Sequence, residues 1–215
     1  MTALAYKFEI DHITVEDYLS GEQISEIKHE YSDGQVYAMA GASIKHNIIN
    51  ANIFALLWMH LNGQSCFPLS SDMLLEISKT KYRYPDVMVI CDDDSSNDDY
   101  IRKNPLIIVE VLSKSTRKKD KTEKRDEYLS LPSLQEYVLI EQDYAEIDVQ
   151  RRNNSWQSAY YFLGDKITFE SVDVTLSVED IYQRVDNNDM QDFLKQKEQD
   201  AHQQAEQQEQ DANEE

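Results

Sequence analysis

Two short apolar runs each contain one carboxylate: YPDVMVIC at residues 84–91 and PLIIVEVL at residues 105–112. Both runs are rich in β-branched residues and have a proline near their start, a pattern typical of buried strands. An ionised carboxylate inside such a strand is costly unless something compensates for its charge. Because the two strands are close enough in sequence to be neighbours in one sheet, we expect Asp86 and Glu110 to share a divalent cation.

Mg²⁺ or Mn²⁺ suits such a pair, because hard cations take oxygen ligands and keep several waters. An ion of this kind activates water and stabilises the charge that develops on a phosphate during displacement. Alternate residues of a strand share a face, so Glu110 should lie on the same face as Ile108 and Leu112. Asp86, directly after Pro85, is expected at the mouth of its strand. The pattern therefore indicates metal-assisted hydrolysis.

A strongly charged helix is predicted over residues 115–131, directly after the second run. Within it, Asp120, Lys124 and Tyr128 recur at i, i+4 and i+8, so they can point back toward the sheet together. The same region holds a concentrated set of basic side chains. This set is either a solvated helix face or a contact to the DNA backbone, and its candidate backbone contacts are Lys114, Arg117, Lys118 and Lys119.

The net charge of −20 argues against broad, sequence-independent phosphate binding, which needs clustered lysine and arginine. Residues 186–215 contain ten acidic residues and two lysines, a net of −8, so residues 1–185 carry −12. Any nucleic-acid site must therefore be a local patch. The two cysteines, Cys66 and Cys91, suggest neither a disulfide framework nor a zinc site, and Cys91 is expected to be a small buried hydrophobe.

The chain divides into an expected domain over residues 1–185 and an acidic, glutamine-rich tail over 186–215, helical or disordered. No run is long enough to span a bilayer and the start lacks a signal-peptide pattern, so a cytoplasmic protein is expected. Helices are expected over residues 14–19 and 43–61, and a further short helix is expected to start at residue 177. The expected strands cover 69–77 and 134–140, in addition to hairpins within 28–40 and 146–162.

The composite of these motifs resembles the Uma-two family of restriction-type endonucleases, which is placed in the PD-(D/E)xK nuclease superfamily. The resemblance runs from about residue 30 to residue 152. It is carried by Pro85-Asp86, by EVLSKSTR at 110–117, by Asp120-x-x-x-Lys124-x-x-x-Tyr128 and by LQEY at 134–137. It also includes EYSDG at 30–34 and His46 at the start of the long helix.

The resemblance implies an α/β, restriction-endonuclease-like fold with a mixed central sheet flanked by helices. It also implies that Asp86 and Glu110 hold the metal and that Lys124 completes the catalytic set. In the wider superfamily a lysine follows the glutamate at the second position, where this chain has Leu112, so Lys124 would act in its place. Glu30, His46 and Asp120 are expected to support the site.

The function expected from this reading is a divalent-metal-dependent DNA endonuclease with DNA as partner, and a homodimer is implied if both strands are cut. The alternative is a catalytically weak or inactive nuclease-fold protein that binds nucleic acid or protein. The acidic charge and Leu112 favour this alternative, whereas the intact set of Asp86, Glu110 and Lys124 favours the enzyme. A third alternative is a nuclease that acts on RNA or on a structured nucleic acid.

Overall fold

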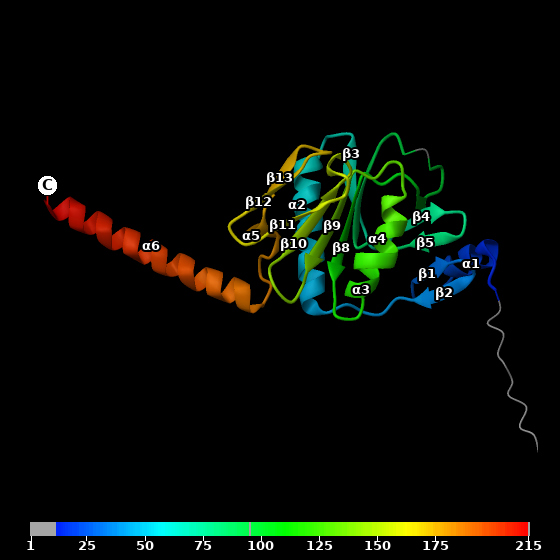
Figure 1. Ribbon diagram of the computed structural model, residues 1–215, viewed down its shortest axis with the longest axis horizontal. Helices are drawn as coiled ribbons and strands as arrows, with labels where there is room; N and C mark the ends of the chain where they lie inside the picture. The colour runs from blue at the N-terminus through cyan, green and yellow to red at the C-terminus, as the bar shows by residue number, and fades with distance from the viewer. Residues whose placement is uncertain (1–11, 95, 215) are drawn as a thin grey trace, which may run out of the picture.

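A six-stranded mixed sheet lies at the centre of the computed structural model, which describes residues 12–94 and 96–214 (Figure 1). Its order is β11-β10-β9-β8-β6-β3. Strands β8 and β9 are parallel, and the other neighbours in this sheet are antiparallel. The strands are β3 (Cys66–Ser70), β6 (Val87–Cys91), β8 (Ile107–Leu112), β9 (Glu136–Glu141), β10 (Ile147–Arg151) and β11 (Ser158–Tyr161).

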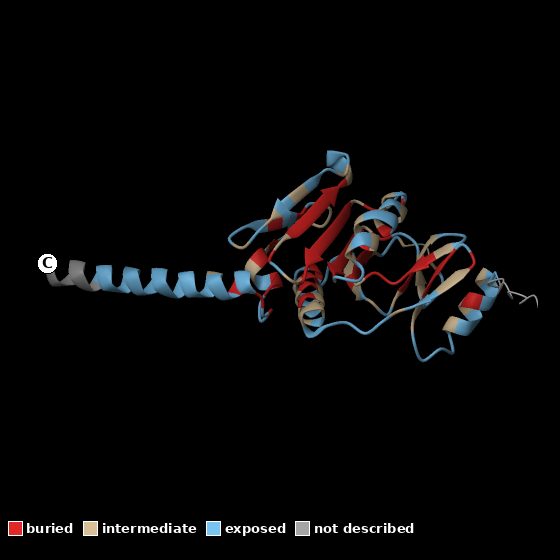
Figure 2. Ribbon diagram, turned by 60° about the horizontal axis from the view of Figure 1, so that its bottom comes forward, coloured by how far each residue is buried: buried red, intermediate tan, exposed pale blue. Residues whose placement is uncertain are grey.

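Side-chain alternation along β8 divides the core into two layers, as the period of a strand requires. Val109 and Val111 pack in the layer that contains the long helix α2 (Ile44–Leu61). Ile108 and Leu112 pack in the opposite layer, together with Tyr128 of a second helical segment. The mixed sheet flanked by helices is therefore the architecture that the sequence predicted, and its strands form the buried centre of the molecule (Figure 2).

A second sheet of five strands, order β2-β1-β5-β4-β7, lies beside the first, and its members are short. They are β1 (His29–Ser32), β2 (Gln35–Ala38), β4 (Leu74–Ser78), β5 (Lys81–Arg83) and β7 (Ile101–Arg102). The β1–β2 hairpin turns at Asp33-Gly34, where both residues have positive φ, as predicted for this dipeptide. A two-stranded sheet is formed by β12 (Lys166–Phe169) and β13 (Val174–Ser177).

The strand expected over residues 69–77 is wrong. Residues 70–73 form a turn that is closed by a hydrogen bond from the Met73 N–H to the Ser70 carbonyl. The chain on either side belongs to different sheets, β3 before the turn and β4 after it. The expected strand joined the apolar residues on both sides of the turn, although the polar run Ser70-Ser71-Asp72 separates them.

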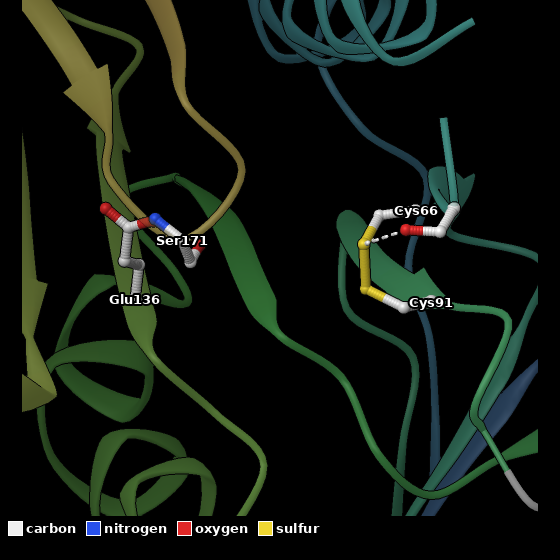
Figure 3. The surroundings of a disulfide bond; sticks show 5 residues. Cys66, Cys91, Glu136 and Ser171 are labelled. Carbon is white, nitrogen blue, oxygen red and sulfur yellow. Dashed lines mark hydrogen bonds between the residues drawn. A yellow bond between two sulfur atoms is a disulfide. The ribbon is translucent and has the colours of Figure 1, made fainter. Parts of the chain in front are cut away.

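The two cysteines are joined in a disulfide between the paired strands β3 and β6, which corrects the expectation that they form none. Cys66 and Cys91 are register partners across the strands, with a Cα–Cα distance of 3.9 Å (Figure 3). Their separation of 25 residues carried no signal of this pairing, because the pairing depends on which strands become neighbours. The Ser171 hydroxyl donates to buried Glu136 at 2.6 Å, which attaches the β12–β13 turn to β9. Figure 3 also labels these two residues.

The helix predicted over residues 115–131 occurs as a continuous segment with three parts: α3 (Arg117–Lys119), the π-helical turn η1 (Asp120–Lys124) and α4 (Arg125–Leu129). The other helical elements are α1 (Val15–Glu22), η2 (Arg152–Asn154), α5 (Val178–Ile181) and α6 (Asn188–Glu214). Helix α6 projects from the body as a long rod (Figure 1). Among the described residues, no helix has the length and apolar character needed to cross a membrane.

Candidate functional site

Glu110 lies in β8, and Asp86 directly precedes the neighbouring strand β6. Val87 of β6 is opposite Val109 of β8, so extending this antiparallel register by one residue places Asp86 opposite Glu110. The Asp86 carboxylate is held there by the Val111 N–H, which donates to its Oδ2 at 2.7 Å. The two residues predicted from the apolar runs are therefore neighbours across the central sheet, close enough for the charge of Asp86 to raise the pKa of Glu110.

Glu110 is buried on the face of β8 that is covered by η1 and α4. Its Oε1 accepts a hydrogen bond from the Tyr128 hydroxyl at 2.7 Å and another from the Lys124 ammonium at 3.1 Å. Burial raises the pKa of Glu110 well above its usual value, and the nearby charges of Asp86 and Asp120 add to the rise, against the attraction of Lys124. The Glu110 carboxyl group therefore keeps its proton to a higher pH than an exposed glutamate does.

Lys124 is the cation at the centre of this site. Its Nζ lies 2.9 Å from Glu30, 3.1 Å from Glu110 and 3.5 Å from Asp120. Burial opposes its charge, but the three carboxylates outweigh burial and raise the pKa of Lys124 above its usual value. The side chain therefore remains an ammonium group.

The π-helical turn η1 determines which side chains of this helix reach the sheet. Asp120, Lys124 and Tyr128 are 2%, 7% and 0% exposed, so the predicted i, i+4, i+8 stripe does face inward. Single π-turns inside α-helices are frequent at functional sites. Leu112, where the wider superfamily has a lysine, is fully buried among apolar side chains, so Lys124 approaches Glu110 from the helix instead.

Glu30 enters the site from the hairpin strand β1. Its Oε2 accepts hydrogen bonds from Arg83 at 3.0 Å and Lys119 at 3.1 Å, while its Oε1 faces Lys124. Burial raises the pKa of Glu30, but Lys124, Arg83 and Lys119 outweigh it and lower this pKa to about 2. Glu30 is therefore a buried, ionised partner of basic groups.

Arg83 is a member of this site that sequence reasoning missed. It is fully buried in β5 and binds Glu30, Glu123 and Glu127. The available signal was an arginine between two tyrosines just before Pro85, in a run otherwise suited to a buried strand. This arginine links the five-stranded sheet to the helix that presents Lys124.

His46 of α2 contacts Asp86 from the opposite side. Its Nε2 lies 3.1 Å from Asp86 Oδ2, the oxygen that also accepts from Val111. Burial lowers the pKa of His46, but the hydrogen bond to Asp86 and the charges of Asp86 and Asp120 outweigh it, so the pKa is raised. His46 thus holds Asp86 in place.

The four residues proposed for the DNA backbone separate into two groups. Arg117 binds Glu141 at 2.6 Å and Asp143 at 3.3 Å, and Lys119 binds Glu30. Lys114 and Lys118 are exposed. Half of the basic patch expected from the sequence is therefore engaged in ion pairs within the chain.

The donor set suits a hard cation with few protein ligands. Among the described residues, no hydrogen bond reaches Glu110 Oε2 or Asp86 Oδ1, and the buried Asp120 Oδ1 has no hydrogen-bond partner. No group of three His, Cys, Asp or Glu side chains in the same part of the chain forms a metal cage. Mg²⁺ is typically bound by one or two carboxylates, with waters and substrate phosphate completing its coordination, so both observations fit it.

Two uncharacterized proteins of Synechocystis sp. are similar to this chain. The first is 35% identical over 173 residues, which cover 79% of this chain and 91% of the relative. The second is 38% identical over 133 residues, covering 60% of this chain and 75% of the relative.

A crystal structure described as "a putative nuclease belonging to DUF820" from Anabaena variabilis has a similar fold. Its TM-score is 0.64 at 16% sequence identity, and the match covers 79% of this chain and 97% of the other. The family model with the description "Putative restriction endonuclease" matches residues 15–192, which include every member of the site. The chain therefore belongs to the Uma2 family and has a nuclease-like fold.

Proposed function

We propose that this protein is a divalent-metal-dependent DNA endonuclease that hydrolyses phosphodiester bonds. Asp86 and Glu110 would hold Mg²⁺ or Mn²⁺ through the oxygens that face away from their protein partners. When bound, such an ion would supply Lewis-acid activation for the hydrolysis. Val111 and His46 keep the Asp86 carboxylate in place, and Tyr128 keeps that of Glu110 in place.

One observation carries this proposal: the Lys124 ammonium, presented by the helix, lies 3.1 Å from Glu110, where it would take the place of the lysine missing at Leu112. Its ammonium is held by three carboxylates, so it is a fixed positive charge beside the metal-binding pair. A fixed cation at this position would orient the phosphate and stabilise the charge that develops on it during displacement. Lys124 therefore acts by its charge and does not accept the proton of the attacking water.

The direct test is cleavage of single-stranded and duplex DNA with Mg²⁺ or Mn²⁺, compared with EDTA. We expect cleavage only with the metal, and its loss in Asp86→Asn and Glu110→Gln. Lys124→Met should lower kcat by roughly 10²- to 10³-fold, because it removes transition-state stabilisation, and should change metal affinity much less. Lys166→Met, an exposed lysine on β12, serves as the matched control and should be active.

Lys118→Met adds a second comparison, because Lys118 is exposed on the same helical segment. If it contacts only backbone phosphate, its loss should weaken binding in a salt-dependent way and leave the chemical step unchanged. Equal, small effects of Lys118→Met and Lys124→Met would contradict the role of Lys124. Binding of DNA without any metal-dependent cleavage would favour the alternative, a nuclease-fold binding module.

A further inference from the structure

An exposed aromatic side chain lies directly beside the candidate site. Tyr37 of β2 is the register partner of Glu30 in β1, so both side chains are on the same face of the hairpin. Glu30 is buried against Lys124, whereas Tyr37 is 47% exposed. One face of the hairpin therefore carries a buried carboxylate of the site and, opposite it, an exposed aromatic ring.

Lys119 connects the two side chains. Its Nζ lies 3.1 Å from Glu30 Oε2 and 5.0 Å from the centre of the Tyr37 ring. The contacts thus run from an exposed ring, through Lys119 and Glu30, to the ammonium of Lys124. The Tyr37 ring is thus about half exposed and in contact with the charged cluster that holds Lys124.

The charge of the protein makes such a ring useful. Residues 1–185 carry a net charge of −12, and the basic residues near the site are largely engaged in ion pairs with the chain's own carboxylates. Binding that depends on neutralising many phosphates is therefore unfavourable here. Stacking of a base on an aromatic side chain does not depend on net charge and accepts every base, because each has a π-face.

We propose that Tyr37 is a stacking platform for an unpaired base next to the scissile phosphate. The substrate class is accordingly single-stranded or locally unpaired nucleic acid, because a base inside a duplex is not free to stack on a side chain. This inference rests on the proposed nuclease function and narrows its substrate. It assigns Tyr37 to substrate binding and places the chemical step with Asp86, Glu110 and Lys124.

The test measures binding in EDTA, where no cleavage is needed. The probes are a fluorescent single-stranded DNA oligonucleotide, the same sequence as a duplex, and a base-free deoxyribose-phosphate chain of equal length. Wild type should bind the single strand more tightly than the base-free chain. Tyr37→Ala should weaken single-strand binding by roughly 5- to 150-fold, the range expected for one lost stack, and should leave binding to the base-free chain unchanged. Tyr37→Phe should bind like wild type.

Tyr160→Ala is the matched control, because Tyr160 is a 53% exposed tyrosine on the edge strand β11. It should bind all three probes like wild type. Equal single-strand binding by wild type and Tyr37→Ala would overturn the stacking role, as would an equal loss of binding to the base-free chain. Failure of wild type to bind any of the three probes would instead overturn the nucleic-acid function on which this inference rests.

Discussion

At the scale of single residues, the site is a set of buried carboxylates organised around one lysine. Glu30, Glu110 and Asp120 all lie within 3.5 Å of Lys124, and Asp86 directly precedes β6, the strand next to that of Glu110. Burial and the neighbouring negative charges raise the pKa of Asp120 as they do that of Glu110. Lys124 therefore does not fully compensate Glu110 and Asp120, whereas Glu30 has Arg83 and Lys119 as further partners. This remaining need for positive charge supports the proposed cation at Asp86 and Glu110.

The first prediction concerns the stability cost of Glu110 without metal. A carboxyl group whose pKa is raised in the folded state binds more protons there than in the unfolded state, so its contribution to stability falls as the pH rises above its ordinary pKa of 4.5. Glu110→Gln removes this contribution and keeps an acceptor for Tyr128. In EDTA, the stability of Glu110→Gln relative to wild type should therefore increase between pH 5 and pH 8.

Denaturant unfolding at the two pH values measures this difference. Asp126→Asn is the control, because its carboxylate is 79% exposed on the same helical segment and should show no comparable trend. A difference between Glu110→Gln and wild type that stays constant with pH would show that Glu110 does not titrate in this way.

At the scale of secondary-structure elements, β5 and the segment from η1 to α4 are joined by buried charge. Arg83 of β5 binds Glu123 of η1 at 2.8 Å and Glu127 of α4 at 2.9 Å, and it also binds Glu30 of β1. The Lys81 ammonium adds a second contact to Glu127 at 2.8 Å. The five-stranded sheet is thereby attached to the helix that presents Lys124, which makes it part of the site's support.

The second prediction follows from this attachment. Arg83→Met leaves buried Glu30 and Glu127 without one of their cations, and removal of one partner of a buried charge network typically costs about 3–5 kcal/mol. The free energy of unfolding, measured by denaturant titration at pH 7, should fall accordingly.

Lys103→Met provides the comparison, because Lys103 forms a partly exposed pair with Glu76 at 2.9 Å. Exposed pairs contribute roughly 0–1 kcal/mol, so this variant should unfold nearly like wild type. If the two variants were equally stable, the Arg83 network would not be what attaches β5 to the helix.

At the scale of the whole molecule, the acidic tail begins inside the core and continues as an isolated helix. Asp189 Oδ2 accepts a hydrogen bond from the Ala145 N–H at 2.8 Å, and Met190 is only 6% exposed within the main core. From residue 194 to residue 208 the side chains of α6 are exposed (Figure 2). The hydrophobic core thus extends past residue 186, where the change in composition begins.

The third prediction compares two truncations of this tail. A chain that ends after residue 196 keeps the contacts of Asp189 and Met190, so its melting temperature should stay within a few degrees of that of the full chain. A chain that ends after residue 186 loses both contacts, and its free energy of unfolding should fall by roughly 2–5 kcal/mol, as for loss of a buried methionine. A large loss of stability already in the longer chain would mean that the exposed part of α6 packs against something.

Local sequence patterns were sufficient to predict the central strands, the two carboxylates and the inward-facing stripe of Asp120, Lys124 and Tyr128. These features depend on short-range periodicity: two residues along a strand and nearly four along a helix. The match to the family model confirms the family resemblance, and the main motifs that carry this resemblance lie in these elements. The roles of these side chains in catalysis are still predictions.

Other features depend on which elements become neighbours, and no local pattern carries that information. The break at residues 70–73 divides the chain between two sheets, and the disulfide requires β3 beside β6. Arg83 reaches its acidic partners only after the second sheet has docked against the helix. Local patterns along the chain were thus enough to predict the strands, the inward face of the helix and the acids that need compensation. Which cations compensate these acids depends on tertiary packing, because ion pairs between distant residues form where packing brings those residues together.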